Sequence, residues 1–150
     1  MGQIASSSRS LDGSAGVGPE WHRGRDGGLC PLSAFDPADV GTPGAGGVYI
    51  VGFGDELLKS LLVGQADDLA YEIVCLKSEP SFRHYERRGG VYITWIELPV
   101  LRRNAVERYV ADRLRPVYDC RRPCMDPMPL ALPAEFDGAS GDLISFSGPR

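Results

Sequence analysis

The chain has 150 residues, of which 43% are hydrophobic and 24% charged, and its formal net charge at pH 7 is −4. This length suits one domain of ordinary size and is too short for two. The net negative charge argues against a generally basic nucleic-acid-binding protein. Apolar runs stay shorter than the roughly 20 residues of a membrane-spanning helix, and residues 1–18 lack the apolar core of a signal peptide. We therefore expect a cytoplasmic protein without a membrane partner.

The first part of the chain predicts a disordered or flexible tail over residues 1–44. Residues 1–30 mix Ser, Gly, Arg and Asp with apolar residues at no helical or strand period, so they bury too little to offset the entropy of ordering. Residues 32–40, which follow Pro31 and contain Pro37, predict a short helical turn at most. The glycines of residues 41–47 predict a hinge into the core.

A small domain is predicted over residues 45–120. Strand-forming residues occupy 48–51 and 60–63, separated by turn residues, which predicts a β-hairpin. Asp67 and Asp68 then supply the N-cap and first turn of a helix that runs to about Ser78.

The second half of this domain repeats the change from strand to helix. A polar loop is expected over residues 79–90, followed by a strand over 91–98 that Pro99 closes. An apolar stripe from Ala105 to Leu114 predicts a second helix, which ends before Pro116. The order is β-β-α-β-α, so the predicted fold is a small α+β domain, a three-stranded sheet with flanking helices.

The last part of the chain, residues 121–150, predicts an irregular tail rich in proline. Leu130 and Leu132 are candidates to pack on the domain. Nothing indicates export, so the cysteines are expected to be reduced. Cys120 and Cys124 lack a second pair of ligands, which argues against a zinc site, and Cys75 lies among apolar residues and is interpreted as a core residue.

Three groups of residues at the joints of these elements resemble the motifs of the GIY-YIG nuclease superfamily. Gly47-Val48-Tyr49 stands for the first motif, on the first strand. Leu62-Val63-Gly64 stands for the second, on the second strand, and leads into the first helix. Glu107, followed by Pro116 and Asp119, stands for the third. The resemblance covers about half of the chain.

The resemblance implies a DNA endonuclease that depends on a divalent cation. Glu107 would hold Mg²⁺ or Mn²⁺, and Tyr49 would orient the attacking water. An arginine would neutralise the phosphate in the transition state. DNA is the partner that this chemistry implies, and the sequence does not identify a protein partner.

The sequence also departs from the family pattern at positions that this chemistry needs. Glu72 stands where the family has its arginine, and a carboxylate there repels a phosphate. Leu62 stands in place of the second motif's tyrosine, and Leu76 where some members have histidine. Cleavage is therefore expected to be impaired. Glu72 and Glu107 are expected to face each other, either sharing a cation or taking up a proton.

Each candidate site residue has a structural alternative. Glu107 can be the capping-box partner of an N-cap at Asn104. Tyr49 can be an ordinary core aromatic of its strand, and Glu72 a solvated surface residue.

Basic charge is concentrated in residues 83–122, which carry 10 basic and 5 acidic side chains. Arg83, Arg87, Arg88 and Arg103 are the candidates for contact with nucleic acid, and the alternative is a solvated arginine-rich surface. An arginine from this region can also replace the missing one at the phosphate. Three functions follow: an impaired endonuclease, a catalytically silent module that binds nucleic acid or protein, and an unrelated α/β binding protein.

Overall fold

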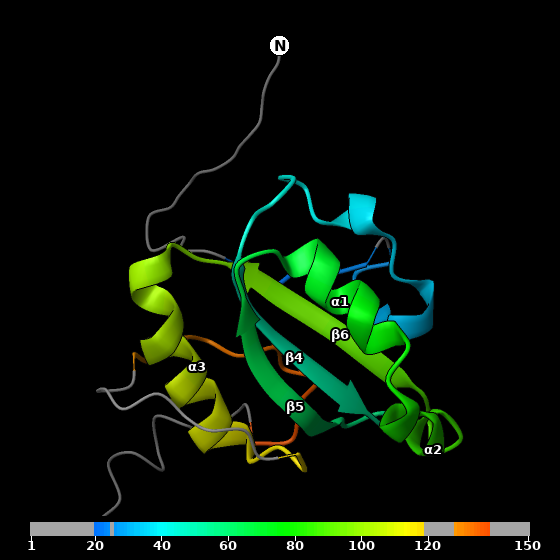
Figure 1. Ribbon diagram of the computed structural model, residues 1–150. Coiled ribbons are helices and arrows are strands. Elements are labelled where there is room, and N and C mark those ends of the chain that lie inside the picture. The colour runs from blue at the N-terminus through cyan, green and yellow to red at the C-terminus, as the bar shows by residue number, and fades with distance from the viewer. Residues whose placement is uncertain (1–19, 25, 119–127, 139–150) are drawn as a thin grey trace, which may run out of the picture.

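The protein folds as a mixed α+β structure around one open antiparallel sheet of four strands (Figure 1). The computed structural model describes residues 20–24, 26–118 and 128–138. No helix in these ranges is long and apolar enough to cross a membrane. In chain order the main elements are β3 (Cys30–Pro31), β4 (Gly47–Phe53), β5 (Lys59–Ala66), α1 (Leu69–Lys77), α2 (Arg83–Glu86), β6 (Val91–Glu97) and α3 (Val100–Leu114).

The order of strands in the sheet is β3-β6-β4-β5, so β4 is paired on both sides. Tyr49 on β4 lies opposite Gly64 on β5 and Trp95 on β6. The predicted order β-β-α-β-α is confirmed between residues 47 and 114, with the short helix α2 added where a loop was expected. The prediction of three strands is wrong, because β3 pairs with the outer side of β6.

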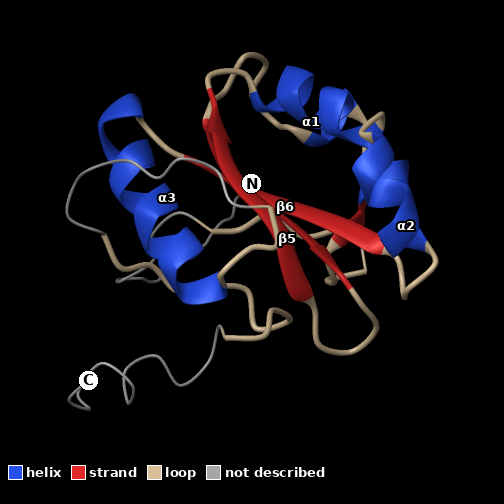
Figure 2. Ribbon diagram, turned by 60° about the horizontal axis from the view of Figure 1, so that its bottom comes forward, coloured by secondary structure: helices blue, strands red, loops and turns tan. Residues whose placement is uncertain are grey.

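Helices cover both faces of the sheet, α3 on one and α1 on the other, and the short helix α2 lies at one end of the sheet (Figure 2). Successive side chains of a strand point to opposite faces. Val48 and Ile50 of β4 therefore pack with Val106 and Val110 of α3. Tyr49 and Val51 pack in a second cluster with Leu69 and Ile73 of α1.

The ends of the two long helices have clear local causes. Asp68 caps α1 as predicted, because its Oδ1 accepts a hydrogen bond of 3.1 Å from the backbone N–H of Tyr71. Helix α3 begins after Pro99, so Asn104 lies inside the helix and the capping-box alternative for Glu107 is wrong. Cys75 is exposed on α1, in contrast to its interpretation as a core residue.

Part of the segment expected to be a flexible tail is packed against the sheet. Leu32 and Phe35 are each only 2% exposed, and the Phe35 ring meets the Trp95 ring edge to face at 5.4 Å between centroids. Two short 3₁₀ helices, Leu32–Ala34 and Pro37–Asp39, carry this segment past α1. The prediction of a flexible tail over residues 1–44 is therefore wrong for residues 29–40, and residues 1–19 lie outside the described ranges.

Residues 128–138 also pack against the core between the sheet and α3. Phe136 is 1% exposed and forms a parallel bridge with Leu58, in the loop before β5. Leu130 and Leu132 are partly buried against the same core, which confirms the predicted packing. Asp119, Cys120 and Cys124 lie outside the described residues.

Candidate functional site

Tyr49 lies in the middle of β4 on the face that α1 covers. Its side chain is almost fully buried, at 4% exposure. The phenolic hydroxyl donates a hydrogen bond of 3.0 Å to Oε2 of Glu72 on α1. Tyr49 is therefore in direct contact with Glu72, which lies at the position where the GIY-YIG pattern has arginine.

The glycines of the two strand motifs are explained by packing. A Cβ atom on Gly64 would lie 2.5 Å from the hydroxyl oxygen of Tyr49, so only glycine leaves room for the tyrosine ring. A Cβ atom on Gly47 would collide with the carbonyl oxygen of Ile96 on the paired strand. Both glycines are needed for the sheet to form around Tyr49, whatever the site does chemically.

Glu107 is a buried carboxylate on α3, with 6% of its surface exposed. Its Oε1 accepts a hydrogen bond of 2.6 Å from the side-chain amide of Gln65 on β5, which also donates at 2.6 Å to Oδ1 of Asn104. Burial raises the pKa of Glu107 above its ordinary value, and the hydrogen bond from Gln65 opposes this rise. Sequence reasoning missed Gln65, because its role depends on the register of β5 against α3.

Replacing Glu107 with glutamine is expected to stabilise the protein at neutral pH. A carboxyl group whose pKa is raised by folding binds more protons in the folded state, so stability falls as pH rises from about 4.3, the ordinary value, through the raised one. Glutamine keeps an acceptor for Gln65 and carries no charge.

Urea unfolding of Glu107→Gln and wild type at pH about 7 and pH about 4 measures this difference. The stabilisation should shrink at the lower pH. An effect of Glu107→Gln that is the same at both pH values would contradict it.

Tyr49 and Glu107 lie on opposite sides of the sheet. Tyr49 packs in the cluster that includes α1, whereas α3 packs with Val48 and Ile50 on the other face. Gln65, the partner of Glu107, is paired with Val48, so it also points to the α3 side. The expectation that Glu72 and Glu107 face each other is therefore wrong.

The surroundings of Glu107 do not fit a divalent cation. Mg²⁺ is usually held by carboxylate oxygens and water, but the groups beside Glu107 are the amide N–H donor of Gln65 and the amide of Asn104. Among the described residues, no group of three or more His, Cys, Asp or Glu side chains is arranged to hold a metal ion. The predicted role of Glu107 as a ligand for Mg²⁺ or Mn²⁺ has no support from its contacts.

The side chain of Arg103 has a structural role inside the protein. It is 8% exposed, its Nε donates to the carbonyl oxygen of Leu98 at 2.9 Å, and its Nη1 donates to Oδ1 of Asp67 at 2.8 Å. These bonds tie α3 to the ends of β6 and β5. The geometry therefore does not support the prediction that Arg103 contacts nucleic acid.

The other three candidate arginines are gathered around α2. Arg83, Arg87 and Arg88 are exposed, and within the described part of the chain none of them forms an ion pair. The guanidinium carbon of Arg88 lies 5.8 Å from the centre of the Phe53 ring, and that ring lies 4.6 Å from the ring of Tyr85. We call these five residues, with exposed His84, the α2 surface.

The α2 surface is remote from Glu107. Helix α2 lies at the end of the sheet beyond α1, whereas α3 lies across the sheet (Figures 1 and 2). The structure thus places the α2 surface and Glu107 on different parts of the molecule.

Comparison of the chain with models of known families, with curated proteins and with solved structures finds no match. The resemblance to GIY-YIG nucleases therefore depends on the three motifs and on the order of elements. Of the motif residues, the glycines and Tyr49 have packing roles and Glu107 has a buried amide partner.

Proposed function

We propose that this chain is a degenerate relative of the GIY-YIG domains that binds DNA through the α2 surface and does not cleave it. The observation that carries the proposal is the set of three exposed arginines without ion-pair partners among the described residues, beside two aromatic rings. Arginine binds phosphate oxygens through a planar fork of N–H donors. Aromatic rings beside such a surface offer stacking partners for unpaired bases.

The loss of cleavage follows from the surroundings of Tyr49. Phosphoryl transfer needs positive charge where the phosphate gains negative charge. Here Glu72 occupies the expected position of the arginine and accepts the tyrosine hydroxyl. A phosphate near Tyr49 would meet a carboxylate, and Glu107 is separated from it by the sheet.

The acidic character of the whole chain limits the DNA-binding area. The net charge is −4, and Asp55 in the turn after β4 lies close to Gly89. We therefore expect the attraction for DNA to come mainly from the arginines of the α2 surface. Binding that depends on so few charges is expected to be weak and sensitive to salt.

Incubation with supercoiled plasmid and with single-stranded DNA in Mg²⁺ or Mn²⁺ tests the proposal. The wild-type protein is expected to retard both DNAs in a gel and to leave them uncut, and Glu107→Gln should behave in the same way. Nicking that Glu107→Gln abolishes would show an active nuclease and contradict the silent assignment. If the wild-type protein retarded neither DNA at low salt, DNA binding would be contradicted.

A further inference from the structure

Three partly exposed aromatic rings meet at the α2 surface. Phe53 ends β4, Tyr85 lies on α2, and Tyr118 follows α3. Between centroids, the ring of Tyr85 lies 4.6 Å from that of Phe53 and 6.4 Å from that of Tyr118. The backbone N–H of Tyr118 donates to the carbonyl oxygen of Leu61 at 2.8 Å, and its ring lies 6.1 Å from that of buried Phe82. Rings from three distant parts of the chain are therefore held together at this surface.

The rings lie among arginines. The guanidinium carbon of Arg88 lies 5.8 Å from the centre of the Phe53 ring, and Arg83 and Arg87 are exposed at the two ends of α2. A guanidinium held against a ring can stack on a nucleobase as well as bind a phosphate. Positive groups together with aromatic rings are the combination by which proteins hold single strands of nucleic acid.

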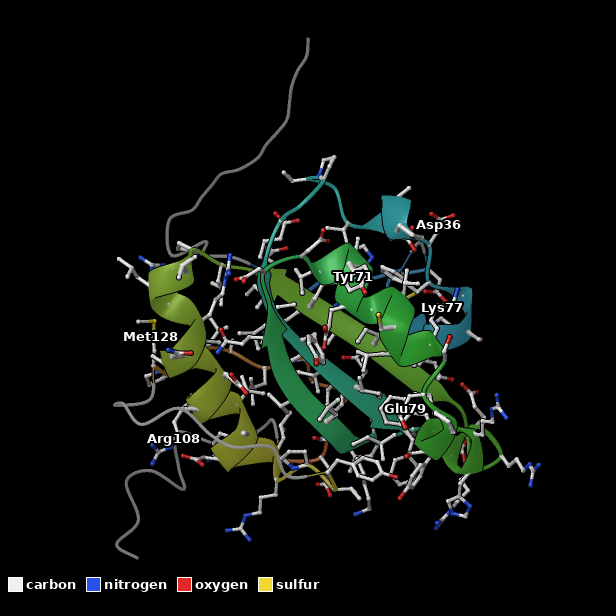
Figure 3. All side chains as sticks on the ribbon, in the orientation of Figure 1. Asp36, Tyr71, Lys77, Glu79, Arg108 and Met128 are labelled. Atoms are coloured by element: carbon white, nitrogen blue, oxygen red, sulfur yellow. The ribbon has the colours of Figure 1, made fainter. Side chains whose placement is uncertain are left out.

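The charge of the α2 surface is too small for phosphate contacts alone to bind DNA tightly. Its arginines are accompanied by the exposed carboxylate of Glu86 on the same helix. Glu79, which Figure 3 shows between α1 and α2, accepts hydrogen bonds from the backbone N–H and the hydroxyl of Ser81. Stacking of one base on an aromatic side chain is worth roughly 5- to 150-fold in affinity. Access of bases to the rings is therefore expected to decide how tightly a strand is bound.

A duplex gives this surface little besides phosphates. Its bases are paired and stacked on one another, so their faces cannot reach Phe53 or Tyr85. Helix α2 has only four residues, Arg83–Glu86, and is about 6 Å long, whereas proteins that read the major groove place several residues of a longer element against base edges. A single strand offers the same surface both phosphates and free base faces.

We infer that the α2 surface binds unpaired DNA in preference to duplex DNA, with bases stacked on Phe53 and Tyr85 and the backbone held by the arginines. This inference rests on the proposed DNA binding and adds the class of strand that is bound. Stacking does not depend on which base is present, so the preference is for unpaired bases and not for a sequence.

Fluorescence anisotropy with three labelled probes of equal length tests the inference at low salt. The probes are a strand of about 12 thymidines, the same strand with abasic sites in place of the bases, and a duplex. The first two carry the same phosphates, so the difference between them measures the bases alone. Wild type is expected to bind the thymidine strand at least about tenfold more tightly than either of the other probes.

The double variant Phe53→Leu/Tyr85→Leu removes both rings and keeps apolar side chains in their place. It is expected to bind the thymidine strand no more tightly than the abasic strand. The matched control is Phe53→Tyr/Tyr85→Phe, which exchanges the two rings and leaves their number unchanged. The control should keep the preference of wild type.

The three probes separate failure of this inference from failure of DNA binding itself. Equal affinity of wild type for the thymidine and abasic strands, or tighter binding of the duplex than of the thymidine strand, would overturn the preference and leave DNA binding in place. A leucine variant that kept the full preference would show that these rings do not hold the bases. Binding of none of the three probes would overturn the proposed function together with the inference.

Discussion

Replacing Phe35 with alanine is expected to lower the free energy of unfolding by about 3–5 kcal/mol, the usual cost of removing a fully buried phenylalanine from a core. Phe35 is 2% exposed and packs edge to face on Trp95. Its loss leaves a cavity over β6 and removes the main anchor of residues 29–40. Urea unfolding followed by circular dichroism measures the change.

The matched control for this prediction is Leu101→Ala. Leu101 is 89% exposed on α3, so its removal should change stability by no more than about 0.5 kcal/mol. If Phe35→Ala cost as little as Leu101→Ala, the segment before β4 would not belong to the folded core.

The double variant Arg83→Gln/Arg87→Gln is expected to bind duplex DNA roughly 30-fold more weakly than wild type at about 0.15 M salt, since each phosphate contact contributes about 0.9 to the slope of log affinity against log salt. Loss of two contacts should reduce that slope by about 1.8. Both side chains are exposed, and neither forms an ion pair with the described residues. The fold should therefore be unaffected.

Arg102→Gln/Arg115→Gln is the control with the same change of charge. Both residues are exposed, and they lie near the start and at the C-terminal cap of α3. Fluorescence anisotropy with a labelled duplex over a series of salt concentrations compares the two double variants. Equal losses of affinity would mean that DNA binding depends only on the total charge of the protein and that the α2 surface is not the binding site.

The main strands and helices could be predicted because their signals are local. The β-branched runs of β4 and β6 favour strands, and Asp68 identifies the start of α1 through a hydrogen bond to a residue only three positions away. The packed segment before β4 has no such signal. Its apolar residues lie in two short 3₁₀ helices and a two-residue strand. These elements are too short for their apolar residues to form a periodic pattern.

The candidate site was harder to predict because it depends on which face of the sheet each helix covers. The resemblance implied that Tyr49 and Glu107 belong to one catalytic site, but the order of motifs along the chain does not determine the face on which α3 packs. In the structure α3 packs beside Val48, the residue before Tyr49, so the two candidates point apart. Arg103 likewise gave no sign in the sequence of its bonds to Leu98 and Asp67.

The most direct test of DNA binding through the α2 surface is to follow the backbone amide signals of the ¹⁵N-labelled protein by NMR as a short DNA duplex is added at low salt. We expect shifts concentrated in residues 83–88 and at Phe53, with the signals of Gln65 and Glu107 unchanged. Shifts centred on Gln65 and Glu107, or no shifts at all, would contradict it.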